Sequence, residues 1–300
     1  MAALNRQLTV QRDGAGSSPA RDLLALGKPT ITLTTLITCA AGFALARAGS
    51  PALVLLCALG GTALVVASAN AFNMVLERDS DARMARTRQR PLPAGRLSPA
   101  LATAAAALMG VAGVGLLAAA VNGLTAWLAL ASLIAYAFVY TPLKRYTPLA
   151  LVIGAVPGAM PPLLGWTAAT DRLDAPGLAL FLVLFVWQIP HFLAIAIRCR
   201  ADYAQAGIRA VTVVHGEESA RLQAMVYSTV LIPVSLLFPL LGVAGPLYGA
   251  TAALLGVGML AISVQSFRTG APLWDKRLFF ASLVYLPVLM FALALDVTLL

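Results

Sequence analysis

Long uninterrupted blocks of apolar residues constrain the fold of this chain more than any other feature. Several of them exceed the roughly 18–20 residues needed to cross the hydrocarbon core of a bilayer. Backbone polar groups inside lipid must be satisfied within their own segment, so these blocks are expected to be helices. The sequence therefore predicts an all-α polytopic membrane protein with about nine transmembrane helices, at about residues 24–46, 51–76, 99–120, 123–140, 148–169, 176–198, 220–242, 245–267 and 278–297.

Charged residues are scarce and lie between the apolar blocks. They make up 11% of the 300 residues, whereas 60% of the residues are apolar. A soluble domain carries about 25% charged residues, so a water-soluble fold is excluded. The net charge of +9 forms no separate basic domain, and we therefore expect no nucleic-acid partner. The three cysteines form no CxxC pair, and no disulfide framework is predicted.

The distribution of Lys and Arg predicts the orientation of the helices. With the N-terminus in the cytoplasm, Arg47 and Arg172 are the only two of the 21 basic residues on the opposite side. Basic residues concentrate in cytoplasmic loops, so we expect a cytoplasmic N-terminus and, with nine spans, an external C-terminus. Residues 1–22 are predicted to be a disordered cytoplasmic tail, followed by a transmembrane domain over residues 23–300.

Asn73, Glu77 and Asp81 form the most informative polar constellation, where the second span leaves the membrane. Their spacing of four and four places them on one face of a helix. At about 6 Å and an effective dielectric near 20, the two carboxylates would repel by roughly 2–3 kcal/mol. Mg²⁺ bound to Glu77 and Asp81 would remove this penalty and bridge to phosphate. If the helix frays here, Asp79 also joins the predicted metal site. The alternative interpretation is that all these acids simply lie at a solvated helix end and bind no metal.

A second acidic corner is predicted at Asp202, followed by Tyr203, just beyond the sixth span. Two such corners flanking one cavity could hold two Mg²⁺ ions on one diphosphate. Basic residues near both corners could bind phosphate oxygens, although some of them could serve only as topology signals. The candidate diphosphate-binding residues are Lys28, Arg78, Arg86, Arg90, Lys144, Arg145, Arg198 and Arg200, together with Tyr203.

His191 is an ionisable residue inside the sixth span, within the segment Trp187-Gln-Ile-Pro-His191. Ionisable residues within a span are functional candidates by default. A histidine here could ligate haem iron or move a proton. The alternative is a neutral histidine that is hydrogen-bonded to a neighbouring helix.

These segments together resemble the UbiA-type membrane prenyltransferases, and in particular the branch that farnesylates haem. The resemblance covers about residues 28–216. The segment Asn73-Met-Val-Leu-Glu77-Arg-Asp79-Ser-Asp81, continuing to Arg90-Pro91-Leu92-Pro93, is similar to the first aspartate-rich motif of that superfamily. Other segments are similar to that branch too: Lys28-Pro29, Tyr140-Thr-Pro-Leu-Lys144-Arg145, Pro161-Pro162 with Gly165-Trp166, Trp187-Gln-Ile-Pro-His191, and Asp202-Tyr203. Of these, the segments Pro161-Pro162 with Gly165-Trp166 and Trp187-Gln-Ile-Pro-His191 are the ones that point to the haem branch.

The sequence departs from the superfamily pattern at two positions. Glu77 stands where many members have Asp, which keeps the charge on a side chain one methylene longer. Ala206 stands four residues after Asp202, where many members have a second acid. The second departure weakens the prediction of a complete second metal site.

The resemblance implies a Mg²⁺-dependent enzyme that transfers farnesyl from farnesyl diphosphate to a vinyl group of haem B, giving haem O and pyrophosphate. It implies a bacterial-type inner membrane location, and as partners the next haem-modifying enzyme or a haem-copper oxidase. Asn73, Glu77, Asp81, Asp202 and His191 are then the expected catalytic residues. Two alternatives stay open at this stage: a related enzyme that prenylates an aromatic or quinone precursor, and a secondary transporter. A transporter would more naturally place its charges near the bilayer midplane.

Overall fold

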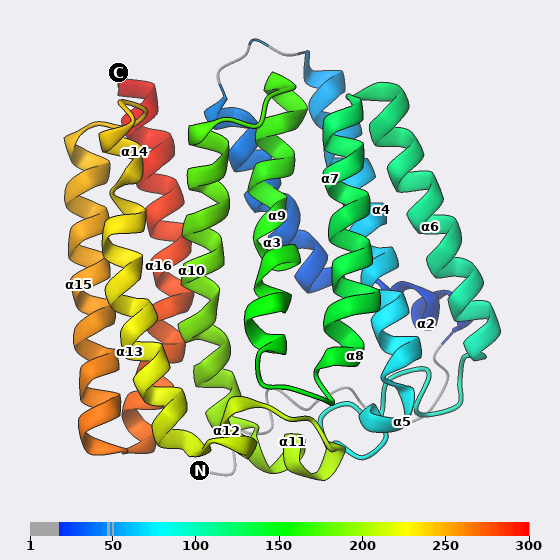
Figure 1. Ribbon diagram of the computed structural model, residues 1–300. Helices are drawn as coiled ribbons and strands as arrows, with labels where there is room; N and C mark the ends of the chain where they lie inside the picture. Colours follow the sequence, from blue (N-terminus) through cyan, green and yellow to red (C-terminus); the bar gives the residue numbers. More distant parts are fainter. Residues whose placement is uncertain (1–17, 47–48, 50, 300) are drawn as a thin grey trace.

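The computed structural model describes residues 18–46, 49 and 51–299, and every regular element in this part of the chain is helical (Figure 1). Within it, eight helical stretches are long and apolar enough to cross a membrane, and the bent pair α2 and α3 is a ninth candidate. The predicted all-α polytopic architecture is confirmed.

The first half of the bundle runs from α2 to α9. Its elements are α2 (Pro19–Leu26), α3 (Pro29–Leu45), α4 (Ala52–Leu76), α5 (Arg78–Asp81), α6 (Pro99–Ala120), α7 (Gly123–Ile134), the π-helix η1 (Ala135–Tyr140), α8 (Thr141–Leu143) and α9 (Ala150–Thr170). The second half consists of α10 (Ala175–Arg198), α11 (Arg200–Ala206), α12 (Val211–Val214), α13 (Gly216–Ser235), α14 (Leu237–Leu240), α15 (Pro246–Thr269) and α16 (Pro272–Leu299).

The first predicted span is not one straight helix. Its two parts, α2 and α3, meet at an angle of 45°. Lys28 has a left-handed backbone with φ of 47°, and the residue before a proline is disfavoured in the α-helical region. Pro29 therefore ends the first helix and starts the next, which places the Lys28 side chain at a helix break. Of the predicted tail, residues 1–17 lie outside the described residues and residues 19–22 belong to α2.

Other span ends differ from the predicted boundaries by a few residues. The fourth span continues through η1 to Leu143, three residues beyond its predicted end. The seventh and ninth spans begin earlier, at Gly216 and Pro272. In the seventh and ninth spans charged residues such as Glu217 and Asp275 occupy the added turn, and hydropathy alone does not reveal that a helix continues into the polar zone.

The long helices pack in two groups that meet along two seams. Helices α3, α4, α6, α7 and α9 form one group, and α10, α13, α15 and α16 form the other. The groups are joined where α9 packs on α10 and where α16 meets α3. The short helices α5, α11 and α12 lie together at one end of the bundle, opposite the end where α16 finishes (Figure 1).

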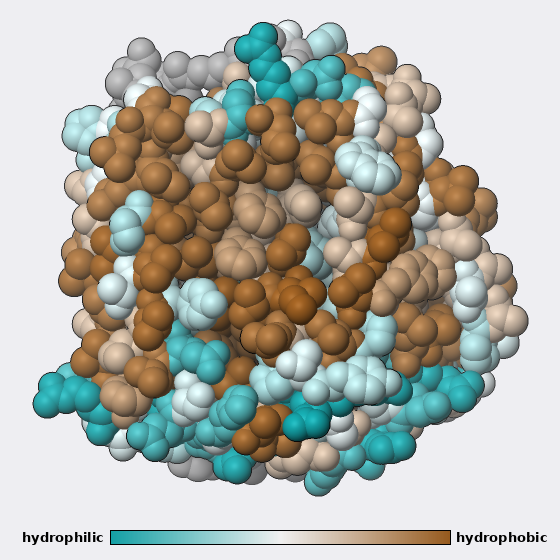
Figure 2. All heavy atoms as spheres, in the orientation of Figure 1, coloured by the Kyte–Doolittle hydropathy of each residue, from teal (hydrophilic) through white to brown (hydrophobic). Residues whose placement is uncertain are grey.

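The surface has the polarity of a membrane protein. Large apolar side chains on the outer faces are strongly exposed, including Leu108, Val111 and Leu254. Figure 2 shows apolar residues over the middle of the visible face, with most of the hydrophilic residues gathered at the end that carries α5, α11 and α12 and a smaller group at the opposite end. The apolar middle is suited to lipid, and the polar end is suited to a membrane surface.

Candidate active site

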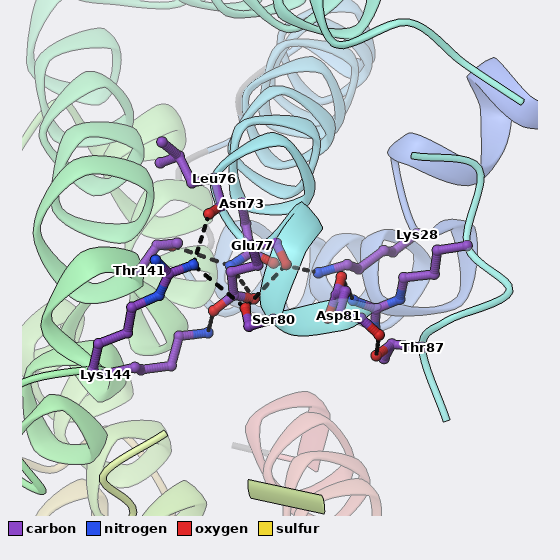
Figure 3. Close-up of polar contacts among 11 residues, drawn as sticks. Lys28, Asn73, Leu76, Glu77, Ser80, Asp81, Thr87, Thr141 and Lys144 are labelled. Atoms are coloured by element: carbon purple, nitrogen blue, oxygen red, sulfur yellow. Dashed lines mark hydrogen bonds and ion pairs between the residues drawn. The ribbon is translucent and has the colours of Figure 1, made fainter. Parts of the chain in front are cut away.

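Asn73 connects three elements at the polar end of α4. Its Nδ2 donates to Oε2 of Glu77 at 2.9 Å and to Oγ1 of Thr141 at 3.1 Å. Its Oδ1 accepts a hydrogen bond from Nζ of Lys28 at 2.8 Å. The amide therefore ties the end of α4 to α8 and to the break between α2 and α3, as Figure 3 shows.

Asp81 lies one turn beyond Glu77, at the end of α5. Its backbone N–H donates to the carbonyl of Glu77 at 2.7 Å, so helical spacing continues past the end of α4. The Asp81 carboxylate is 1% exposed and pairs with Arg90 at 2.7 Å. The Thr87 hydroxyl donates to the Asp81 carbonyl at 2.8 Å, which folds the following loop back over the acid. Asn73, Glu77 and Asp81 thus line one cavity.

Lys144 is placed by a change of helix type. The fourth span widens into the π-helix η1, a feature that is frequent at functional sites. Thr141 follows it and donates to the carbonyl of Tyr136 at 2.9 Å. One turn later, Nζ of Lys144 lies 2.5 Å from Oε1 of Glu77 and 4.5 Å from the centre of the Tyr140 ring.

The two acids of the site are each matched by a cation. Glu77 and Asp81 are at most 8% exposed, and their partners are Lys144 and Arg90. Leaving a buried charge without its partner costs about 3–5 kcal/mol, and each ion pair avoids this cost. A phosphate group that attracted the same cations would leave both carboxylates free to bind a metal ion. The arrangement can therefore exchange internal ion pairs for a metal–phosphate complex.

The oxygen atoms of this cluster fit Mg²⁺. The described residues contain no group of three or more His, Cys, Asp or Glu side chains placed to hold a metal. The chain offers instead the carboxylates of Glu77 and Asp81 and the amide oxygen of Asn73. Mg²⁺ commonly takes one or two carboxylates and completes its coordination with water and substrate phosphates. This donor set fits one Mg²⁺ ion that is shared with a phosphate ligand.

The cluster forms the polar end of a cavity of about 600 Å³. The cations around this end come from separate segments of the chain: Lys28, Arg86, Arg90, Lys144 and Arg209. The rest of the cavity extends between the helices and is mainly apolar, with threonines along α3. Its lining there includes Ile31, Thr34, Thr35 and Thr38 of α3, Gly154, Gly158 and Pro161 of α9, Leu184, Trp187, Gln188, His191 and Phe192 of α10, and Leu286 of α16.

Tyr203 of α11 reaches the cavity from the loop that follows α10. Burial raises the pKa of its phenol above the ordinary value, and nearby Arg86 opposes this effect. The phenol therefore stays protonated at neutral pH and can donate a hydrogen bond to an anionic ligand. The backbone N–H of Arg209 donates to the carbonyl of Lys144 at 2.8 Å, which ties this loop to the end of α8.

Three other predicted residues, Arg78, Asp79 and Arg145, lie outside the cavity lining. The Asp79 side chain is 72% exposed and pairs with Arg78 at 2.9 Å. Asp79 lies two residues from each of the other acids, so a continuing helix turns it away. Arg145 donates to the carbonyl of Leu76 at 3.1 Å and to the Ser80 hydroxyl at 3.5 Å. Arg145 therefore satisfies the open end of α4.

The predicted second acidic corner does not reach the cavity. Asp202 is half-buried in α11 and is absent from the lining, although the next residue belongs to it. Arg200 pairs with Glu217 at 3.4 Å, and the Arg198 guanidinium lies 5.0 Å from the centre of the Phe279 ring. Asp202 therefore does not join the acids of α4 and α5 in lining this cavity. The loop contributes one cation, Arg209, and the Tyr203 phenol to the lining.

His191 lines the cavity from α10, well inside the bundle. Its Nδ1 lies 2.8 Å from the Ser282 hydroxyl of α16. Its ring is stacked between two aromatic rings, Trp187 at 5.3 Å and Phe279 at 5.2 Å. The histidine thus combines a fixed ring orientation with access to the cavity.

Several residues in or beside the cavity were given no role in the sequence analysis. Tyr140, which lines the cavity, and Thr141, which accepts a hydrogen bond from Asn73, lie in a segment that was used for its resemblance and its basic pair. Gln188 donates to the carbonyl of Ala155 at 2.8 Å and crosses to α9 beside Gly158. A glutamine within a long apolar span is itself a signal of an internal polar contact. No sequence signal pointed to Ser282 as the partner of His191, because serine is common in membrane helices.

Comparison with known proteins shows what the chain is similar to. Residues 35–285 match the UbiA prenyltransferase family. The chain is 49% identical over 278 residues to a protein named protoheme IX farnesyltransferase from Anaeromyxobacter sp. (strain Fw109-5), covering 92% of this chain and 94% of the relative. A protein of the same name from Myxococcus xanthus (strain DK1622) is 44% identical, covering 92% of this chain and 95% of the relative.

Solved structures share the fold at much lower identity. A structure described for digeranylgeranylglyceryl phosphate synthase has a TM-score of 0.81 and 16% identity, covering 94% of this chain and 99% of its own. A UbiA homologue from Archaeoglobus fulgidus, bound to GPP and Mg²⁺, has a TM-score of 0.65 and 17% identity, and the match covers 91% of this chain and 99% of the homologue.

Proposed function

We propose that this chain, which belongs to the UbiA prenyltransferase family, transfers the farnesyl group of farnesyl diphosphate to a vinyl group of haem B. The products are haem O and pyrophosphate. The names of the curated relatives, which are 44–49% identical to the chain, support this reaction. The observation that carries it is the polarity of the cavity, where paired acids and cations at one end adjoin an apolar interior that contains His191.

The polar end is the proposed diphosphate site. Lys144 and Arg90, which now pair with Glu77 and Asp81, would turn to the phosphate oxygens. Arg86 and Arg209 line the same end of the cavity and would complete the cationic shell. Glu77, Asp81 and the Asn73 amide would hold Mg²⁺ against the diphosphate. When bound, the metal would neutralise the diphosphate and favour its departure.

In the chemical step, the bond between farnesyl C1 and the diphosphate oxygen breaks and its electron pair leaves with pyrophosphate. The cationic side chains stabilise the negative charge that develops on the leaving group. The allylic cation that remains is attacked by the vinyl π electrons, and water adds to the new cation with loss of a proton, giving the hydroxyethylfarnesyl group. The apolar walls around Ile31 and Leu184 shield the first cation from premature attack by water.

The reaction predicts a specific product from purified protein in detergent. Incubation with haem B, farnesyl diphosphate and Mg²⁺ should give a haem that is heavier by one farnesyl group and one water, detected by chromatography with mass detection. Omission of either substrate is the control. Prenylated hydroxybenzoate or quinone precursor in a parallel incubation, with unchanged haem, would instead support the aromatic prenyltransferase alternative.

The proposed location is a bacterial inner membrane, with the N-terminus and the loops around α5 and α11 in the cytoplasm and the end of α16 outside. The arrangement of basic residues supports this orientation. Both loops lie at the same end of the bundle, so they share one aqueous phase (Figure 1).

The orientation predicts which positions a membrane-impermeant maleimide can reach. In a variant without Cys39, Cys57 and Cys199, new cysteines at the exposed positions Ala94 and Gln205 should react only after the membrane is opened. A cysteine at exposed Arg172, at the other end of the bundle, should react in intact cells and serves as the control. Labelling of either loop from outside would contradict the orientation.

A further inference from the structure

Ser282 of α16 is a buried serine that contacts α10 beside the cavity. Two side chains of α10 meet it: Nε1 of Trp187 donates to the Ser282 carbonyl at 2.8 Å, and Nδ1 of His191 lies 2.8 Å from the Ser282 hydroxyl oxygen. Ser282 is 0% exposed. The cavity-facing histidine is therefore oriented by a residue that does not itself line the cavity.

The direction of the hydrogen bond follows from the other contact of Ser282. Its hydroxyl donates to the backbone carbonyl of Phe279 at 2.6 Å. A serine hydroxyl has one proton, and a carbonyl can only accept, so this proton is committed to Phe279. Ser282 must then accept from His191, and Nδ1 of His191 carries the proton. Because the bond at one ring nitrogen decides the state of the other, Nε2 of the neutral ring is left with a free lone pair.

The surroundings of His191 favour its neutral form. Its ring stacks with Trp187 and Phe279, and the Arg198 guanidinium lies over the Phe279 ring, 5.0 Å from its centre. A second positive charge beside this guanidinium is disfavoured. None of the described hydrogen bonds or ion pairs of His191 involves a carboxylate that would offset such a charge.

We propose that Ser282 is a positioning residue that holds His191 with Nε2 unprotonated, so that Nε2 becomes an axial ligand of the iron in the haem acceptor. The proposal rests on the proposed function. Nδ1 and Nε2 diverge across the ring, so Nε2 points away from Ser282. Phe192, whose ring lies 5.7 Å from that of His191, and Leu286 both line the cavity and offer apolar contacts to a porphyrin. A ligating histidine that donates its other N–H to an oxygen is a stronger and better oriented ligand.

The test compares two porphyrins that differ only in iron. Purified protein is titrated with haem B and with metal-free protoporphyrin IX. His191→Ala and Ser282→Ala should each weaken haem B binding about 10–100-fold, the usual effect of losing a partner of a metal ligand. Binding of the metal-free porphyrin should stay within about two-fold of wild type, and Ser282→Thr, which keeps the hydroxyl, should restore haem binding.

A second readout reports the iron–histidine bond directly. In the ferrous complex, resonance Raman should show an iron–histidine stretch that disappears in His191→Ala and moves to lower frequency in Ser282→Ala. Ser263 of α15 is the matched control, because its buried hydroxyl also donates to a carbonyl one turn earlier, that of Met259, at 3.0 Å. Ser263→Ala should leave the stretch and both porphyrin affinities unchanged.

Three other results of these titrations would contradict either the role of Ser282 and His191 or the proposed function. Equal weakening for both porphyrins would show that Ser282 acts only through folding, and would overturn the proposal. Unchanged haem affinity in His191→Ala, with slower turnover, would make His191 a proton acceptor and overturn it as well. If wild-type protein binds neither porphyrin, the proposed function itself fails, and this result is distinct from the first two.

Discussion

Replacing Glu77 by glutamine is expected to lower kcat for farnesyl transfer by about 10²–10³-fold, because a group that acts on developing charge is lost from the transition state. The substitution keeps the shape of the side chain and removes its charge. It removes one of the two carboxylates of the proposed Mg²⁺ site and leaves Lys144, 2.5 Å away, without its partner. Asp81→Asn should have a similar effect through Arg90. Initial rates across a range of Mg²⁺ concentrations are the measurement.

Asp79→Asn is the matched control for both substitutions. It removes the same charge two residues from either acid, but its side chain is 72% exposed and lies outside the cavity lining. Its kcat should remain within about two-fold of wild type. The Mg²⁺ concentration for half-maximal activity should rise for Glu77→Gln and stay constant for Asp79→Asn. Equal losses in all three variants, at matched levels of folded protein, would remove the distinction between the acids.

The sequence predicted that Asn73, Glu77 and Asp81 share one face, but not that Asp202 lies outside the cavity lining, and both outcomes have the same physical origin. Asn73, Glu77 and Asp81 could be placed from sequence because helical periodicity fixes the relative direction of residues four apart. Asp202 and Arg200 lie in a short helix beyond the end of α10, where the direction of the chain depends on long-range contacts. Glu217, which pairs with Arg200, is seventeen residues away along the chain. No local pattern predicts such a partner.

The helix break at Lys28 and the π-helix before Lys144 show a second limit. Hydropathy predicted both spans, and the fold confirms them. The break and the widening, however, are what carry these two lysines to Asn73 and Glu77. The proline at position 29 signals a break, but the direction of the lysine depends on its left-handed backbone. A π-helix has no reliable sequence signature, so the reach of Lys144 could not be predicted.

Replacing Gly165 by alanine is expected to destabilise the folded protein strongly, at or above the upper end of the roughly 1–3 kcal/mol that overpacking costs. A Cβ at Gly165 of α9 would overlap the backbone carbonyl oxygen of Cys39 in α3. In the same crossing, a Cβ at Gly42 would overlap the carbonyl of Pro162. Both obstacles are backbone atoms of packed helices, so neither can move as a flexible side chain does.

This close crossing gives the segment from Pro161 to Trp166 a structural role. The segment contributed to the resemblance to haem-farnesylating enzymes, yet Gly165 and Trp166 do not line the cavity, whereas Pro161 does. Trp166 packs against Gly177 at the start of α10. The two glycines let α3 lie directly on α9, and this contact sets the position of α3, whose first residues follow Lys28.

The expected loss can be measured as a lower melting temperature of purified protein in detergent, followed by size-exclusion fluorescence. Gly42→Ala should behave in the same way, because it obstructs the same crossing from the other side. Gly115→Ala on α6 is the control, since a Cβ there meets nothing within 4 Å. Its melting temperature should be unchanged or slightly higher. If Gly165→Ala melted like wild type but no longer converted haem, the segment would contact the acceptor, and the helix crossing would not explain its glycine.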